Sequence, residues 1–215
     1  MGDRGRVRRV DPLADTTTAS VCSHRRDGPL RTPQPLATIR FVTLLDEVVQ
    51  TDYGQFDLVW AAAPGGFDGN FDRFFAGQVN GLVGAADPGG LYLHFARRSG
   101  GSRVRIELLS QEPQLHDEDP WEDLVEVSVT VPEGSAPNWF SWGDEDSGEL
   151  ALPSGTYRVR VSAEGRDLGA DNEFADEVVD TYLLEFWPAP YRPDEILKVG
   201  SVDAQYWHQE VGSRR

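Results

Sequence analysis

Acidic side chains are concentrated in the segment 142–157, which reads WGDEDSGELALPSGTY. Its carboxylates are Asp144, Glu145, Asp146 and Glu149, in a short loop that contains glycine and precedes an expected strand. Carboxylates at this density can hold a metal ion, work as an acid/base pair, or form an acidic surface for a basic partner. These three chemistries define three classes of function for the protein.

A metal site of the EF-hand type does not fit the loop. An EF-hand that began at Asp144 would need an acidic or amide ligand at position five, glycine at six and glutamate at twelve. The sequence has Gly148, Glu149 and Gly155 at those positions. A looser calcium site that uses Asp144, Asp146 and a backbone carbonyl stays open. The four histidines have no paired spacing that suits zinc, so we expect no cofactor.

Residue patterns for catalysis are scarce in the sequence. It has no Gly-x-Ser-x-Gly motif, and its single cysteine, Cys22, lies in a segment with no apparent source of an activated thiolate. Glu107, Glu126 and Glu185 are expected on outward strand faces, where two of them could meet as a hydrolase pair. A polar face with cross-strand arginine partners explains them more simply. We therefore expect that the protein is not an enzyme.

Tryptophans beside carboxylates have the composition of an interface hot spot. Trp139 and Trp142 stand directly before the acidic loop, in PNWFSWGDED. A second cluster repeats this composition and comprises Asp117, Glu118, Asp119 and Trp121. We expect both groups to bind a partner, with Trp139 or Trp142 as the apolar anchor. Exposed tryptophans on a carbohydrate-binding domain are the alternative interpretation.

The distribution of charge indicates the kind of partner. The chain carries −16 overall, yet residues 1–33 hold seven arginines against four aspartates. Residues 34–215 therefore hold 13 basic against 32 acidic side chains. Such a surface repels nucleic acid and anionic membranes and attracts basic proteins, although acidity also serves solubility. No apolar run approaches the roughly 20 residues of a membrane span, and no secretory leader is visible, so we expect a cytoplasmic protein.

Alternation of apolar and polar residues predicts the fold. Segments of five to nine residues with period two are separated by stretches rich in Gly, Pro, Asp and Ser. These expected strands lie near 38–45, 53–60, 90–98, 103–109, 124–132, 156–165 and 181–188. They predict an all-β protein, an antiparallel β-sandwich of about seven or eight strands. Short helical turns are expected within 69–82 and 193–200.

The expected organisation has three parts. Residues 1–36 are rich in arginine, threonine and proline without apolar periodicity, which predicts a disordered arm. Residues 37–190 form the sandwich, and residues 191–215 form a C-terminal tail. Within the sandwich, Tyr157 follows a turn and is expected to return its hydroxyl to the upstream backbone, as a tyrosine corner does.

The order of these features resembles the competence protein J family, whose members inhibit a DNA-entry nuclease. The matching stretches are DYGQFDLVW, GLVGAADPGGLYLHFA, VEVSVTVP, LALPSGTYRVRV and DTYLLEFWP, within about residues 50–190. The insertion GRDLGADNEFADEVV is longer than the family pattern. The resemblance implies a nuclease inhibitor or a related immunity-type partner of a basic enzyme, in which both acidic clusters face the nuclease. No single inhibitory residue is transferred.

Overall fold

The computed structural model describes residues 40–60, 66–144 and 146–212. The chain divides into two units, residues 1–37 and 38–215, and every described residue belongs to the second unit. The arm expected over residues 1–36, with Cys22, lies outside the described residues.

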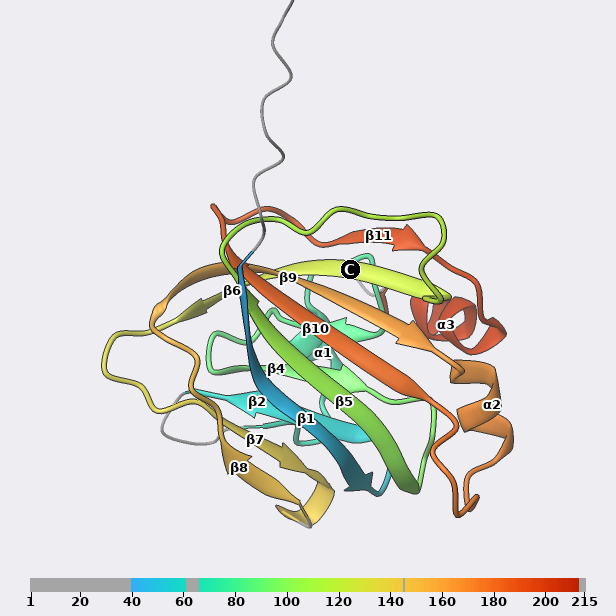
Figure 1. Ribbon diagram of the computed structural model, residues 1–215. Helices are drawn as coiled ribbons and strands as arrows, with labels where there is room; N and C mark the ends of the chain where they lie inside the picture. The colour runs from blue at the N-terminus through green and yellow to red at the C-terminus, as the bar shows by residue number, and fades with distance from the viewer. Residues whose placement is uncertain (1–39, 61–65, 145, 213–215) are drawn as a thin grey trace, which may run out of the picture. The chain divides into compact units, whose positions relative to one another are not determined.

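Two sheets form the described unit (Figure 1). The six-stranded sheet contains, in spatial order, β1 (Phe41–Thr51), β5 (Gly100–Leu109), β10 (Thr181–Pro188), β9 (Gly155–Glu164), β6 (Asp123–Val131) and β11 (Glu195–Lys198). The five-stranded sheet contains β3 (Val83–Gly84), β4 (Gly90–His94), β2 (Gln55–Val59), β7 (Asn138–Ser141) and β8 (Ser147–Glu149). Neighbouring strands are antiparallel except β5 and β10, which are parallel. The all-β sandwich is confirmed.

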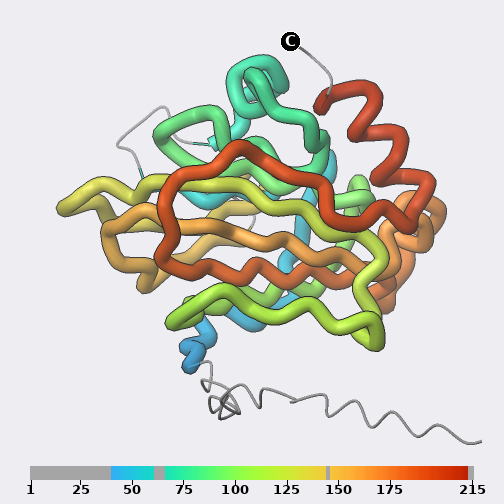
Figure 2. Tube along the Cα trace, turned by 90° about the horizontal axis from the view of Figure 1, so that it is seen from above, coloured from blue at the N-terminus to red at the C-terminus, as the bar shows by residue number. Residues whose placement is uncertain are grey.

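Helical elements are few among the described residues. They are α1 (Phe71–Phe75), η1 (Trp142–Asp144), α2 (Arg166–Asp171), α3 (Val202–Trp207) and η2 (His208–Gly212). The helical turn expected within 69–82 is α1, which begins at an Asn70 cap whose side chain accepts a hydrogen bond from Arg73 N. Figures 1 and 2 both show α3 beside α2. No helix among the described residues is long and apolar enough to cross a membrane.

The main core lies between the two sheets. Alternate residues of each strand point inward, so Phe56 and Leu58 of β2 belong to the same buried cluster as Val127 of β6 and Leu184 of β10. The apolar positions of the period-two pattern therefore face the core, although the polar positions of β6 and β9 are mostly buried as well. Tyr157 closes one edge of this core, since its hydroxyl donates to the Pro153 carbonyl oxygen at 2.9 Å and confirms the expected corner.

The chain beyond Pro190, expected as a tail, contributes β11 and α3. The helical turn expected within 193–200 is wrong, because these residues form an edge strand. Ile196 of β11 pairs with Val125 of β6 and is partly buried against the main core. A strand is favoured here because β6 would otherwise present an unpaired edge. The strands number 11 in the described residues, more than the seven or eight expected, because β3, β7, β8 and β11 are too short to show alternation.

The outer face of the six-stranded sheet carries buried ion pairs. Glu126 accepts from Arg158 Nε at 2.9 Å and from Arg160 Nη2 at 2.7 Å, and all three side chains are almost fully buried. Backbone carbonyls of the segments that cross this face complete the shell, with Pro113 O accepting from Arg160 and Pro193 O from Arg158. The strand positions expected to be solvated are thus paired and covered.

The substitution Glu126→Ala should destabilise the fold severely. It leaves two buried guanidinium groups without their counter-ion, a defect that costs about 3–5 kcal/mol. Urea unfolding followed by tryptophan fluorescence measures this loss. The control Arg103→Ala breaks an exposed pair with Asp46 and should cost about 1 kcal/mol or less. Equal losses in the two variants would contradict the buried network.

Candidate functional site

The acidic loop forms the connection from β7 through η1 to β8. It places the two candidate tryptophans differently: Trp139 is buried in the main core, whereas 43% of Trp142 is exposed. Gly148 lies over the Trp139 indole, and a Cβ at this position would approach Trp139 Nε1 to 2.6 Å. The glycine in the loop therefore serves packing, and Trp142 is the tryptophan available to a partner.

The carboxylates of the loop are partly engaged with the protein itself. Asp146 Oδ2 accepts a hydrogen bond from Gln50 N of β1 at 2.7 Å, and Asp146 N donates to Ser141 Oγ at 2.9 Å. Glu149 is exposed. Glu145 and the side chain of Asp144 lie outside the described residues. The loop is thus anchored to the end of β1 with Trp142 at its turn.

The second acidic cluster lies elsewhere. Asp117 and Glu118 are exposed, while Asp119 and Trp121 are half-buried, in the segment between β5 and β6. Lys198 of β11 donates to the Trp121 carbonyl oxygen at 2.7 Å. This segment follows the upper edge of Figure 1 beside the six-stranded sheet, whereas η1 lies at the lower edge beside the five-stranded sheet. The structure does not bring the two expected clusters together.

Beside Trp142 lies an unusual turn. The connection between β1 and β2, which belong to different sheets, makes a tight turn at Tyr53 and Gly54, whose φ angles are 57° and 65°. Two successive positive φ angles are typical of a type I′ turn, which favours Asn-Gly and disfavours a bulky first residue. Tyr53 is nevertheless 57% exposed, with its ring centroid 5.1 Å from Trp142 and 5.0 Å from the guanidinium carbon of Arg98. A strained backbone thus displays an aromatic ring at the surface.

Tyr53 and Trp142 stand at the mouth of a cleft of about 710 Å³. The cleft lies on the outer face of the five-stranded sheet, because Tyr92 and His94 line it while Leu91 and Leu93, their neighbours on β4, point into the main core. Its other aromatic lining residues are Phe67, Phe71, Phe95 and Trp207. A volume of this size, with mostly aromatic walls, is typical of ligand sites.

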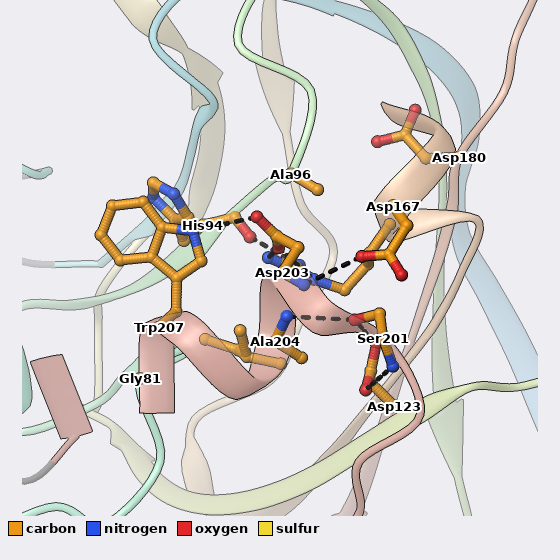
Figure 3. Close-up of polar contacts among 12 residues, drawn as sticks. Gly81, His94, Ala96, Asp123, Asp167, Asp180, Ser201, Asp203, Ala204 and Trp207 are labelled. Atoms are coloured by element: carbon orange, nitrogen blue, oxygen red, sulfur yellow. Dashed lines mark hydrogen bonds and ion pairs between the residues drawn. The ribbon is translucent and has the colours of Figure 1, made fainter. Parts of the chain in front are cut away.

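The inner wall of the cleft depends on α3. Arg166 of α2 is fully buried, and its Nε and Nη2 donate to Asp203 Oδ2 at 2.9 and 2.5 Å, while Nη1 donates to the His94 carbonyl oxygen at 2.9 Å (Figure 3). Asp203 Oδ1 accepts from Trp207 Nε1 at 3.2 Å. The Trp207 ring lies beside His94 with centroids 3.9 Å apart. One guanidinium therefore joins α2, β4 and α3 around the cleft.

The start of α3 is fixed by two further carboxylates. Asp123 Oδ2 accepts from Ser201 Oγ at 2.5 Å, and Ser201 Oγ in turn accepts from Ala204 N at 3.0 Å as the helix N-cap. Asp167 Oδ1 accepts from Asp203 N at 2.9 Å. Figure 3 shows these contacts on the side of Asp203 away from Trp207. The helix that carries the inner wall is therefore held rigidly.

Burial keeps the floor of the cleft without charge. Burial, together with the nearby Arg166, lowers the pKa of His94 to about 3, so its ring is neutral at pH 7. Burial raises the pKa of Tyr92, whose hydroxyl lies 2.7 Å from His94 Nδ1. Burial also raises the pKa of Asp57 to about 6, so this carboxyl, which accepts from Gln55 Nε2 and Phe67 N, is still ionised at pH 7. The cleft thus combines neutral aromatic walls with carboxylates of Asp68 and Asp203 in its lining.

A loop after α2 extends the same edge. The fully buried Arg97 donates to backbone carbonyl oxygens of Glu173 at 3.3 Å and Glu177 at 3.0 Å, and also to that of Ala175. This clamp fixes the loop within the unexpected insertion, and the loop displays Phe174 at 81% exposure. Arg98 pairs with Glu173 at 3.7 Å and so connects the loop to Tyr53. The η1 turn, the β1–β2 turn and this loop all lie along the lower edge of Figure 1.

The described carboxylates considered from sequence for metal binding and for acid/base catalysis do not line the cleft. Among the described residues, no group of three or more His, Cys, Asp or Glu side chains is arranged to hold a metal ion. Of the three glutamates considered as a hydrolase pair, Glu185 has its pKa raised to about 7, mainly by burial. Its neighbour Glu126 is held between Arg158 and Arg160.

Sequence reasoning missed most of the cleft. Tyr92 and His94 were detectable, because they alternate with Leu91 and Leu93 and so occupy the opposite face of the strand. Tyr53 had a weaker signal, an aromatic residue directly before glycine in a tight turn between two strands. The pairing of Arg166 with Asp203 had none, since it joins segments 37 residues apart in the chain.

Comparisons with known proteins give a remote likeness. No protein-family model matches the chain, and neither does any curated protein. Among solved structures it is similar to ComJ from Bacillus subtilis, described as an inhibitor of the DNA-degrading activity of NucA, with 18% identity and a TM-score of 0.46. That match covers 70% of this chain and 99% of ComJ. A second match, described as crocagin biosynthetic gene J, has 16% identity, a TM-score of 0.44 and coverage of 71% and 99%.

The chain thus resembles ComJ weakly, as the sequence motifs predicted. A likeness at this level assigns no role to any residue of the chain.

The buried carboxyl of Glu185 predicts a pH-dependent stability. Its pKa in the folded state, about 7, exceeds the ordinary value of 4.5, so the fold binds a proton that the unfolded chain releases. Stability from this group therefore falls as pH rises from about 4.5 to 7. Glu185→Gln should raise the melting temperature at pH 8 and give no such gain at pH 4. Glu133→Gln, an exposed charge removal, is the control, and equal gains at both pH values would contradict the assignment.

Proposed function

We propose that this chain is a protein-binding module that recognises a basic partner through the edge around Trp142. One observation supports this most: a strained, exposed Tyr53 and an exposed Trp142 contact each other at the mouth of an aromatic cleft. Exposed aromatic anchors beside charged side chains are the composition of hot spots. We name this edge the Trp142 surface and define it by Tyr53, Trp142, Asp146 and the loop 172–179.

The strain at Tyr53 supports a role in binding. Asparagine would suit the turn better, because a positive φ angle raises the conformational energy of non-glycine residues other than Asn and Asp. Tyr53 therefore lowers the stability of the fold through its backbone, and it gains little stabilisation from burial because 57% of its surface is exposed. Its ring instead completes the mouth of the cleft with Trp142. Selection for display of the ring explains both features.

The charge of the Trp142 surface suits a basic partner. Asp146 lies at the η1 turn, while Glu173, Asp176 and Glu177 lie on the loop held by Arg97. Arg98 is the basic residue between them, and it is already shared by Glu173 and Tyr53. An excess of carboxylates attracts a basic protein over distance and raises its association rate. Aromatic side chains then supply the contact area once the partner arrives.

The finer proposal is an inhibitor or immunity-type partner of a basic enzyme, and it includes no catalysis by this chain and a cytoplasmic location. The sequence resemblance to the competence protein J family makes a nuclease the first enzyme to test. An acidic surface can occupy the basic groove that a nuclease uses for phosphates. The cluster of Asp117, Glu118, Asp119 and Trp121 lies outside the Trp142 surface, so we assign it a secondary role at most.

Carbohydrate binding is the second candidate, because the rings of the cleft could stack on a sugar. A neutral sugar would bind with little dependence on salt, whereas a basic protein would be released by salt. The two candidates therefore separate in one elution experiment.

The substitution Tyr53→Asn should weaken partner binding while it preserves or raises stability. Asparagine before Gly54 relieves the turn, yet it removes one ring from the cleft mouth. The full-length protein, immobilised, should retain a basic protein from native lysate, and a salt gradient should release it. Tyr53→Asn and Trp142→Ala should each reduce retention about tenfold or more, as loss of a hot-spot residue does.

Two further variants control this experiment. Amide replacements of Asp144, Glu145 and Asp146 together should slow association with the retained protein and flatten its dependence on salt. Tyr191→Ala removes an exposed aromatic ring from outside the Trp142 surface and should leave retention unchanged. If Tyr191→Ala reduced retention as much as Trp142→Ala did, the surface would be misplaced.

A further inference from the structure

The cleft is more specific than a general apolar hollow. Its mouth is formed by Tyr53 and Trp142, and its inner wall by Trp207 and His94. The ring faces of tryptophan and tyrosine carry negative potential, which attracts a cation placed over them. Arginine suits such faces better than lysine, because a guanidinium is planar and weakly hydrated.

The protein's own arginines already show this contact. The guanidinium carbon of Arg98 lies 5.0 Å from the Tyr53 ring centroid at the mouth. Arg73 makes the same contact with Phe74 at 4.6 Å, next to the cleft lining. The Arg98 side chain is 63% exposed, and its ion pair with Glu173 is long at 3.7 Å. A guanidinium therefore sits on the outer side of the mouth and is held weakly there.

One carboxylate of the lining, Asp68, is open to a further cation, whereas Asp203 is already neutralised by the buried Arg166. Asp68 and Asp203 line the cleft, and the only basic residue that the described lining contains is Arg98 at its rim. The deeper arginines are committed: Arg166 to Asp203 and the His94 carbonyl, Arg73 to Asp68 and Asp87. His94 adds no positive charge at pH 7. Asp68 keeps 53% of its side chain exposed and remains accessible to a second donor.

We propose that the cleft receives an arginine side chain of the partner, with the guanidinium inside the cleft, bounded by Trp207 on the inner wall and by the contacting rings of Tyr53 and Trp142 at the mouth. This inference rests on the proposed function, because it names the chemical group of the basic partner that the Trp142 surface recognises. The cleft of about 710 Å³ exceeds one side chain, so the residues that flank the arginine enter with it. A partner's guanidinium competes with Arg98 for the face of Tyr53.

A matched pair of peptides tests the proposal without the partner. The probes are acetyl-Gly-Arg-Gly-amide and its citrulline analogue, in which a neutral urea of the same shape replaces the guanidinium. Binding is followed by NMR shifts of the tryptophan indole N–H groups of the full-length protein. The arginine peptide should bind about tenfold tighter than the citrulline peptide, and the shifts should be largest for Trp142 and Trp207. Equal binding of the two would overturn the proposal.

Three variants locate the site. Arg98→Gln removes the competing cation and should tighten arginine binding severalfold, an increase that a misfolded variant could not give. Trp142→Ala should weaken it about tenfold, and Tyr191→Ala should not change it. Weaker binding in Arg98→Gln, or unchanged binding in Trp142→Ala, would contradict the assignment. A lysine peptide that binds as tightly as the arginine peptide would exclude guanidinium recognition.

The outcome is separable from that of the proposed function. If a basic protein is captured through Trp142 but the arginine and citrulline peptides bind equally, the cleft inference fails and the partner surface stands. If the arginine peptide binds selectively but no basic protein is retained at low salt, the proposed function fails instead.

Discussion

The buried ion pair between Arg166 and Asp203 determines the shape of the candidate site. Without it, α3 would be joined to α2 by side-chain contacts of Asp167 with the α3 backbone but by no ion pair, and Trp207 would lose the carboxylate that orients its indole. The same guanidinium binds the backbone of β4 at His94, so it joins the sheet to both helices. A fully buried guanidinium is costly unless its donors are satisfied, and here a carboxylate and a carbonyl satisfy them. This one group, carried by α2, therefore holds β4 and α3, the two elements that form the inner wall of the cleft.

The sandwich itself was predictable because alternation reports burial directly. In β6 and β9, Val127 and Val159 point inward in register, as their period-two positions indicated. The polar positions between them were misjudged as solvated, because alternation cannot reveal that other segments cover a face. Glu126 and its two arginines are buried under backbone from residues far along the chain. The alternation within a strand indicates which side is polar, but it does not indicate whether that side is exposed to solvent.

The candidate site was predictable only in part, for a related reason. Trp142 and its acidic neighbours are contiguous in sequence, so composition alone identified them. Tyr53, His94 and Trp207 come from three distant segments, and only the folded chain shows that they share a cleft. Trp139 has neighbours in sequence that resemble those of Trp142, yet strand alternation buries its side chain, which composition alone does not reveal. No sequence pattern explained the insertion 165–179, whose backbone is held by hydrogen bonds from Arg97 in the structure.

The features of the Trp142 surface that suit partner binding lower the stability or the solubility of the isolated protein. A tyrosine at positive φ, an 81% exposed Phe174 and a concentration of carboxylates each weaken the isolated fold or its solubility. The core and the buried ion pairs offset these costs. Such local conflicts with the rules of folding are expected at functional sites, and here three of them occur along one edge.

Site-specific photo-crosslinking tests the central claim most directly. A photoreactive phenylalanine analogue would replace Trp142 in one variant of the full-length protein and Trp121 in another, and both would be irradiated in native lysate at low salt. The account predicts a crosslink from position 142 to one basic protein, lost at about 1 M salt, where screening reduces electrostatic range to roughly 3 Å. A crosslink to that protein only from position 121 would contradict the account, because it would place the partner on the opposite edge.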